Sequence, residues 1–127
     1  MTIHTRNNAP QYHTKDTSRI CEIVHPNHSD AKNQSLAQAT LAPGAKTQPH
    51  FHPHSEEIYF VLRGRAEFSL DGDVSTLMAG DAVVIPPGAP HQICNIGDED
   101  LVFLCCCAPA YSHDDTILCD EIPSDER

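Results

Sequence analysis

Short apolar runs separated by proline and glycine give the chain its most regular pattern. The groups Pro43-Gly44, Asp71-Gly72 and Pro86-Pro87-Gly88 separate runs rich in Val, Ile, Leu, Phe, Tyr and Thr, and the middle of the chain lacks helical periodicity. Many short strands with turn signals about every 8–12 residues are typical of a β-sandwich or β-barrel. We therefore predict an all-β fold with strands at residues 20–24, 34–41, 57–62, 66–70, 74–77, 82–85, 91–95 and 101–107.

The two ends of the chain lack this pattern. Residues 7–19 form a polar connector, and the polar group at 112–115 could cap one short C-terminal helix that begins at Thr116. A chain of 127 residues is long enough for one core and too short for a separate cofactor domain. We predict a single domain over residues 1–127, with the barrel at about 34–108, an extra strand before it, and peripheral or flexible ends at 1–19 and 112–127.

The charge balance is strongly acidic, with a formal net charge of −10. Such a charge repels phosphate backbones and anionic lipids, so we expect neither nucleic acid nor a membrane surface as a partner. The first twenty residues are polar, without the pattern of a signal peptide, and no stretch of about 18 consecutive apolar residues occurs. We therefore expect a cytoplasmic protein.

His50 and His52 stand two residues apart in a predicted extended segment, which places both imidazoles on one face and within reach of one ion. After a turn at residues 53–56, the chain returns in a strand in which Glu57 and Tyr59 share a face. A carboxylate beside two imidazoles is a site for a divalent Fe, Mn, Ni, Cu, Co or Zn ion.

A fourth ligand is available from a second segment. A strand ends at Ile85, the rigid Pro86-Pro87-Gly88 segment reverses the chain, and His91 opens the next strand. Two neighbouring side chains are expected at the surface instead: His54 lies in the turn after Pro53, and Glu56 has the opposite parity to Glu57.

These two segments match the two signature motifs of the cupin superfamily, G-x5-H-x-H-x4-E-x6-G and G-x5-P-x-G-x2-H-x3-N. The matching positions are Gly44, His50, His52, Glu57 and Gly64 in the first motif, and Gly80, Pro86, Gly88, His91 and Asn95 in the second. Ten fixed positions in two correctly spaced blocks are far more specific than one short motif. The chain thus resembles a small single-domain cupin, of the type often labelled mannose-6-phosphate-isomerase-like.

The resemblance implies a jelly-roll barrel of six to eight strands, usually dimeric, with one divalent ion on His50, His52, Glu57 and His91. Three neutral imidazoles and one carboxylate leave such an ion with net positive charge and, if it is six-coordinate, two open positions for water, dioxygen or a bidentate ligand. A barrel that has kept the shape but lost the use of the metal is the alternative. The strand at 20–24 has apolar residues to bury, so we expect a homodimer.

Three further residues are candidates for the lining of a substrate pocket. Tyr59 has the parity to point into the barrel, either as a catalytic acid, base or anchor or as an ordinary core tyrosine. A hairpin with its turn at Asp98 would place Cys105 opposite His91, facing the ion, and Phe103 opposite Ile93. A turn centred half a residue later would bring Cys106 inward instead.

The cysteines do not suggest a disulfide framework. Three of the six, Cys105 to Cys107, are consecutive, and neighbouring strand residues point to opposite faces. The chain has no C-x2-C pair, which argues against a zinc ribbon or a thioredoxin-type site. A buried Cys105 is a small apolar side chain, an oxidisable thiol, or a group beside the ligands that tunes the metal.

Three function classes follow. The first is a metal-dependent enzyme that acts on a small organic molecule, by dioxygenase chemistry or by isomerase or lyase chemistry. The second is a sensing or binding module for a small ligand or a metal, without turnover, and the third is a purely structural barrel. The few cations near the motifs, Lys46, Arg63 and Arg65, argue against a sugar phosphate as the substrate.

Overall fold

The computed structural model describes residues 1–119, and almost all of its regular structure is β. A short 3-10 turn, η1 (Arg6–Asn8), comes before the strands. Among the described residues, no helix has the length and apolar character needed to cross a membrane. The strands are β1 (Gln11–His13), β2 (Arg19–Val24), β3 (Ser35–Leu41), β4 (His50–Phe51), β5 (Glu56–Arg63), β6 (Arg65–Leu70), β7 (Asp73–Met78), β8 (Ala82–Ile85), β9 (His91–Asn95), β10 (Leu101–Ala108) and β11 (Ile117–Leu118).

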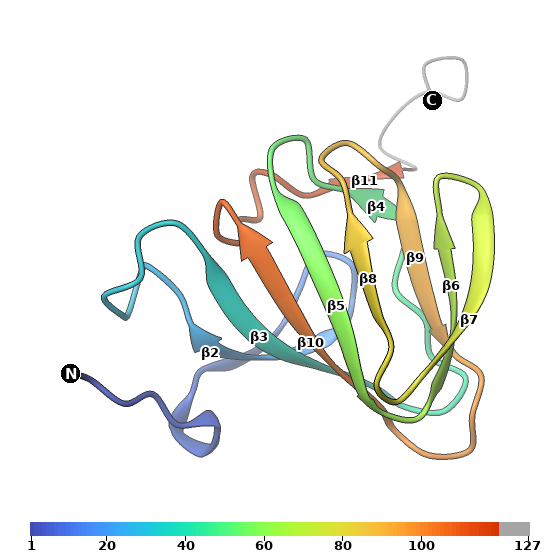
Figure 1. Cartoon of the computed structure of the whole chain (residues 1–127), viewed down its shortest axis with the longest axis horizontal. Coiled ribbons are helices and arrows are strands. Elements are labelled where there is room, and N and C mark those ends of the chain that lie inside the picture. Colours follow the sequence, from blue (N-terminus) through green and yellow to red (C-terminus); the bar gives the residue numbers. More distant parts are fainter. Residues whose placement is uncertain (120–127) are drawn as a thin grey trace.

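The strands form two antiparallel sheets that face each other and enclose the core (Figure 1). One sheet has the order β1-β2-β3-β10-β5-β8, and the other has the order β11-β4-β9-β6-β7. Consecutive strands often lie in different sheets, as in a jelly roll. The all-β jelly-roll prediction is confirmed.

The predicted strands agree with the observed ones to within one or two residues, but both ends of the chain differ from expectation. The predicted C-terminal helix is wrong for the residues described, because Ile117 and Leu118 form β11 and pair with Phe51 and His50 of β4. The polar segment before residue 19 contains β1, which pairs with β2. Residues 120–127, which make up half of the predicted peripheral tail at 112–127, lie outside the described residues.

The predicted hairpin between the strands of His91 and Cys105 is also wrong. β9 pairs with β4 and β6, whereas β10 lies in the other sheet between β3 and β5. His91 therefore faces His50 and Leu70, and Phe103 pairs with Val61 instead of Ile93. The segment after Asn95 crosses between the sheets because Asn95 holds it: its side-chain amide donates to the carbonyls of Leu41 and Glu99, at 2.9 and 2.8 Å.

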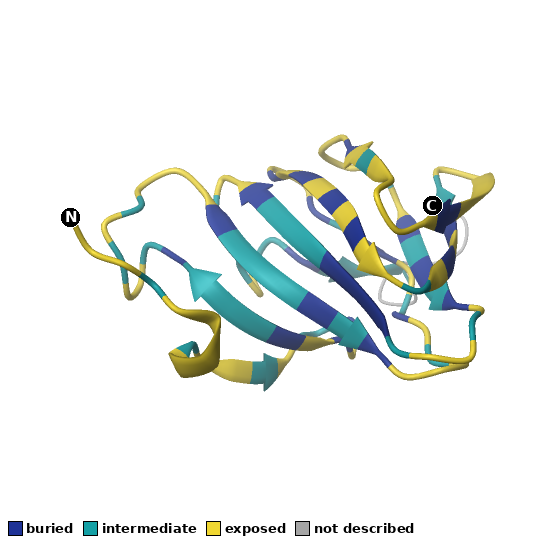
Figure 2. Cartoon of the chain, turned by 60° about the horizontal axis from the view of Figure 1, so that its bottom comes forward, coloured by how far each residue is buried: buried dark blue, intermediate teal, exposed yellow. Residues whose placement is uncertain are grey.

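Burial alternates along β5, which shows as bands on that strand in Figure 2. Glu57, Tyr59 and Val61 are buried, and Ile58 and Phe60 are exposed on the outer face. Burial of an apolar side chain such as Val61 stabilises the folded state by about 1.5–3 kcal/mol. This energy determines which residues of β5 face inward and which face outward. The parity brings Glu57 to the inner face, where the site lies.

Gly64, the last residue of the first motif, joins β5 to β6. Its φ of +95° is in the left-handed region, and a Cβ there would lie 3.0 Å from the carbonyl oxygen of Asp100 and 3.1 Å from Leu101 Cα. Only glycine satisfies both the backbone angle and the close approach of β10. This motif position therefore fixes the fold and not the chemistry.

Candidate metal centre

Three buried histidines meet at the inner face of the smaller sheet. His50 opens β4, His52 lies directly after that strand, and His91 opens β9 as the strand partner of His50. One ring nitrogen of each lies within 4.8 Å of those of the other two. The three side chains are nearly inaccessible, with exposed fractions of 1%, 4% and 2%. The prediction that these residues come together is therefore correct, although they come from separate motifs.

The outward nitrogens of the three rings are all held by the protein. The Nδ1 atoms of His50 and His91 donate to the carbonyls of Gln48 and Ala89, at 2.7 and 3.0 Å. The Nδ1 of His52 lies 3.2 Å from the carbonyl oxygen of Asp115 and 3.2 Å from the hydroxyl oxygen of Thr116. A hydrogen on each Nδ1 leaves the lone pair on Nε2, which is the tautomer that binds a metal.

Glu57 brings a carboxylate to the same point. Its Oε1 lies 3.3 Å from His52 Nε2 and 3.5 Å from His91 Nε2. Among the described residues, Glu57 Oε1 and His91 Nε2 are buried polar atoms with no hydrogen-bond partner. A carboxylate oxygen that faces the Nε2 lone pair of a neutral imidazole, as here with His91, is unfavourable unless a cation lies between them. The donor set and these two unsatisfied atoms fit a divalent ion.

The electrostatics differ between the rings of the cluster. Burial, reinforced by the nearby His91, lowers the pKa of His50 to about 4, so this ring stays neutral at neutral pH. Burial opposes a charge on His52 as well, but the neighbouring Glu57 carboxylate outweighs it and raises the pKa of His52. Burial likewise opposes ionisation of Glu57, yet His52 and His91 outweigh it and lower the pKa of that carboxyl. At neutral pH the site thus offers an ionised carboxylate and at least one neutral imidazole.

Tyr59, Phe103 and Cys105 line the same cavity as His50, His52 and Glu57. Cys105 does point inward, but it does so as the strand partner of Tyr59, not of His91. The ring of Tyr59 packs against Phe103, at 4.8 Å between centroids, and lies 5.9 Å from the ring of His91. The cavity volume is about 30 Å³, room for roughly two water-sized bodies.

The two expected surface residues lie as predicted. His54 is exposed and donates from its ring to Asp115, at 2.6 Å, and Glu56 is exposed as well. Asp115 also accepts hydrogen bonds from the backbone N–H groups of His54 and Ser55. This carboxylate thereby fixes the turn that follows His52.

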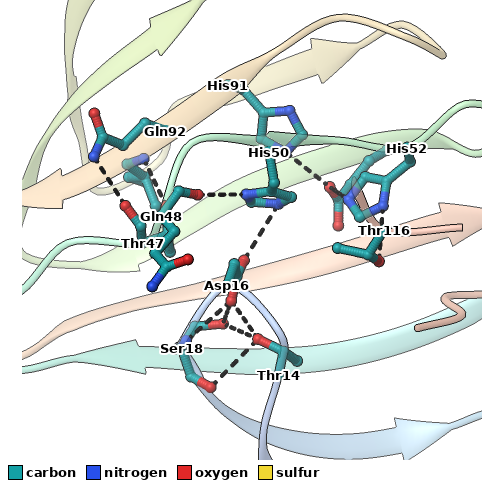
Figure 3. A network of polar contacts seen from close by, with 12 residues as sticks. Thr14, Asp16, Ser18, Thr47, Gln48, His50, His52, His91, Gln92 and Thr116 are labelled. Carbon is teal, nitrogen blue, oxygen red and sulfur yellow. Dashed lines mark hydrogen bonds and ion pairs between the residues drawn. The ribbon is translucent and has the colours of Figure 1, made fainter. Parts of the chain in front are cut away.

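The sequence interpretation missed the contributions of both chain ends to the site. Asp16, in the loop between β1 and β2, reaches His50 with a distance of 3.3 Å between Oδ2 and Nε2 (Figure 3). Tyr12 and Tyr111 also line the cavity, and the ring of Tyr111 lies 6.1 Å from that of His52. No sequence pattern marks these residues, because the contacts join segments far apart in the chain.

A two-sheet jelly roll with a buried cluster of three histidines and a glutamate defines a class of metal-site barrels. The family model "Cupin domain" matches residues 37–107, and the chain therefore belongs to the cupin family. The family expected from the two motifs is thus confirmed.

Known proteins resemble the chain over different extents. It is 49% identical to the uncharacterised protein MJ1618 of Methanocaldococcus jannaschii, over 83% of this chain and 84% of that protein. It is 37% identical to the oxalate decarboxylase OxdC of Bacillus subtilis over 61% of this chain, but spans 22% of that longer protein. The solved structure of KdgF from Halomonas sp. superposes with a TM-score of 0.75 at 19% identity, covering 88% of this chain and 96% of that one.

Proposed function

We propose that this cupin binds one divalent transition-metal ion per chain on His50, His52, Glu57 and His91, and that it acts there on a small organic molecule. The observation that carries the proposal is the set of inward-facing donors. Glu57 Oε1 lies 3.3–3.5 Å from the Nε2 atoms of His52 and His91, buried and without a hydrogen-bond partner among the described residues. The ion is one of Fe, Mn, Ni, Cu, Co or Zn, because the donors are three nitrogens and a carboxylate oxygen.

When bound, such an ion supplies a Lewis acid that polarises a carbonyl or hydroxyl group and, if it is redox-active, a route for electrons. The chain itself shields the polarised carbonyl or hydroxyl group from water and orients the metal ligands. Tyr59 and Phe103 exclude water on one side, and the three histidines keep their orientation through the carbonyls that hold Nδ1.

Tyr59 is the proposed catalytic residue. Burial and the nearby Glu57 carboxylate raise the pKa of its hydroxyl well above the ordinary value, so Tyr59 remains protonated at neutral pH. A protonated hydroxyl in the cavity donates a hydrogen bond or a proton to a substrate oxygen and does not begin the reaction as a base. This role fits isomerase or lyase chemistry, as well as the positioning of a ligand for dioxygenase chemistry.

The size of the cavity favours a second candidate, a module that binds a metal or a small ligand without turnover. About 30 Å³ leaves little room for a substrate beside an ion unless side chains move. We retain the enzyme as the first candidate because one of the curated relatives is named a decarboxylase. A structural barrel without metal is the candidate that fits least well, because it leaves Glu57 Oε1 and His91 Nε2 buried without a hydrogen-bond partner among the described residues.

The experiment loads the metal-free chain with Fe²⁺, Mn²⁺ or Zn²⁺ and screens small hydroxy acids, keto acids and dicarboxylates for product and for dioxygen uptake. Product that depends on the metal, and that falls by about 10²-fold or more in Tyr59→Phe while metal content is unchanged, supports the enzyme. Thermal stabilisation by a ligand without any product supports the binding module. Loss of metal binding in Tyr59→Phe contradicts the proposed role of this residue.

A further inference from the structure

The loop between β1 and β2 places a second carboxylate at the candidate metal centre. Asp16 has an exposed fraction of 7%, and its Oδ2 lies 3.3 Å from Nε2 of His50 (Figure 3). This nitrogen is the one that faces the cluster. Asp16 belongs to neither cupin motif and lies 34 positions before His50 in the chain, as the two residue numbers show.

The two oxygens of Asp16 have different surroundings. Oδ1 accepts hydrogen bonds from the hydroxyl of Thr14, from the hydroxyl of Ser18 at 2.7 Å and from the backbone N–H of Ser18 at 3.0 Å. Oδ2 has no such donor among the described residues and is aimed at His50. The carboxylate is therefore held by one oxygen and presents the other to the cluster.

The position of the loop is fixed relative to the histidine. The backbone N–H of Gln48 donates to the carbonyl of Asp16 at 2.9 Å, and the carbonyl of Gln48 accepts from Nδ1 of His50 at 2.7 Å. The same short segment thus holds both the loop and the ring. Oδ2 of Asp16 therefore approaches Nε2 of His50 because hydrogen bonds to Gln48 hold both the loop and the imidazole ring in place.

The contact cannot be an ordinary hydrogen bond in the metal-binding tautomer. Since Nδ1 of His50 donates to a carbonyl, Nε2 of the neutral ring carries a lone pair, and Oδ2 of Asp16 is also an acceptor. Two acceptors at 3.3 Å repel each other unless a cation lies between them. Oε1 of Glu57 and Nε2 of His91 show a similar relationship at 3.5 Å, and neither atom has a hydrogen-bond partner among the described residues.

Three pairwise separations are also those expected of neighbouring donors to one ion. For metal bonds of about 2.0–2.2 Å, neighbouring donors in a tetrahedral or octahedral site are about 2.8–3.6 Å apart. The pairs His50–Asp16, His52–Glu57 and His91–Glu57 are 3.3, 3.3 and 3.5 Å apart. We propose that Asp16 is a fifth protein ligand of the metal, so that the centre is three histidines, Glu57 and Asp16. This inference rests on the metal site proposed above.

The extra carboxylate has a consequence for the ligands that the site selects. Three neutral imidazoles and one carboxylate leave a divalent ion with a charge of +1, whereas a second carboxylate makes the centre neutral. It also takes one of the two positions that a bidentate ligand needs. The centre should therefore bind dianions such as oxalate weakly and favour neutral or monodentate ligands.

The test compares the wild type with Asp16→Asn and, as a matched control, Glu22→Gln. Glu22 lines the same cavity and accepts a hydrogen bond from Tyr12 at 2.5 Å, but the histidine it pairs with is His28, outside the cluster. Zn²⁺ and Co²⁺ affinity is measured by competition with a chelator, and oxalate affinity by titration of the Co²⁺ absorption spectrum. Circular dichroism checks that each variant is folded.

Asp16→Asn should weaken metal binding by about tenfold or more and tighten oxalate binding to the loaded protein by about tenfold, while Glu22→Gln changes metal affinity by less than about twofold. A variant that weakens both metal and oxalate binding indicates a damaged loop and overturns the proposal, as does unchanged metal affinity. A wild type that binds no metal overturns both this inference and the proposed function. If Asp16→Asn does not fold, a crystal structure of the Co²⁺-loaded wild type decides the question, since Asp16 Oδ2 either contacts the ion or turns away from it.

Discussion

The thiol of Cys107 donates a hydrogen bond to Oε2 of Glu57, with 3.1 Å between Sγ and the oxygen. The two residues are strand partners on β10 and β5, so the ladder itself sets this contact. The bond occupies one oxygen of the carboxylate and leaves Oε1 facing His52 and His91. Cys107 is therefore a positioning residue for the candidate ligand Glu57.

The first prediction concerns this contact. Cys107→Ala should weaken metal binding by about tenfold, because partners of ligating side chains typically contribute 10–100-fold in affinity. Cys107→Ser keeps a donor and should remain closer to the wild type. Chelator competition measures both variants. Equal affinities for the alanine variant and the wild type would remove the positioning role.

The second prediction concerns pH. In the metal-free chain the raised pKa of His52 means that this ring keeps a proton at pH values where an ordinary histidine has lost it. A metal must expel that proton, so metal affinity should rise with pH up to the raised pKa and then level off. His50, with a pKa of about 4, should release no proton above about pH 5.

Isothermal titration calorimetry checks this prediction. Zn²⁺ is titrated near pH 6.5 in two buffers with different ionisation enthalpies, and the difference gives the number of protons released. We expect a release approaching one proton per ion. A measured release of zero, together with an affinity that is constant between about pH 6 and 8, contradicts the prediction.

The third prediction concerns the cysteine run. Cys105 lines the metal cavity, whereas Cys106 pairs with Ile58, a residue exposed on the outer face. Burial raises the pKa of the Cys105 thiol well above its ordinary value, so its thiolate is scarce. In the Zn²⁺-loaded chain, peroxide should oxidise Cys106 before Cys105. In the Fe²⁺-loaded chain the order should reverse, because the oxidant forms beside Cys105. Peptide mass spectrometry reads the order directly, and the same order with both metals would contradict the prediction.

The fourth prediction is a homodimer. The strand whose apolar residues led us to expect a dimer, β2, pairs with β3 of its own chain. A better candidate surface is the outer face of β5 and the edge strand β8, where Ile58, Phe60, Leu62 and Val84 are 38–55% exposed. Contiguous exposed apolar side chains of this kind mark interaction surfaces.

Light scattering at micromolar concentration tests this prediction. We expect a dimeric mass for the wild type and a monomeric mass for Phe60→Lys. Val74→Lys, on β7 of the other sheet with an exposed fraction of 59%, is the matched control and should remain dimeric. A monomeric wild type would contradict the prediction.

The sequence was sufficient to predict the strands and to bring four candidate ligands together, because the inner and outer parity of β5 and the motif spacing are local properties. It was not sufficient to predict strand neighbours. The short segment after Asn95 suggested a hairpin, yet in a jelly roll such a segment can cross to the opposite sheet. Cys105 lies on the inner face, as predicted, but it does so because it pairs with the inward-facing Tyr59 of β5 and not with His91, from which the prediction was made.

Asp16 illustrates a different limit. Its loop reads as an ordinary polar turn, and the contact with His50 depends on how β1 and β2 are placed against the barrel. Thr116, which contacts Nδ1 of His52, likewise belongs to a segment expected to be peripheral. Contacts between distant segments carry no local sequence signature, so these contributions became visible only in the fold.

Elemental analysis measures whether the histidine cluster binds one metal ion per chain. The metal-free chain is reloaded with Zn²⁺, desalted and compared with His50→Ala/His52→Ala and with the control His4→Ala/His13→Ala, which removes two histidines outside the cluster. We expect one ion per chain in the wild type and the control, a higher melting temperature for both when loaded, and no stoichiometric metal in the double variant of the cluster. Stoichiometric metal in His50→Ala/His52→Ala, or none in the wild type, would contradict this expectation.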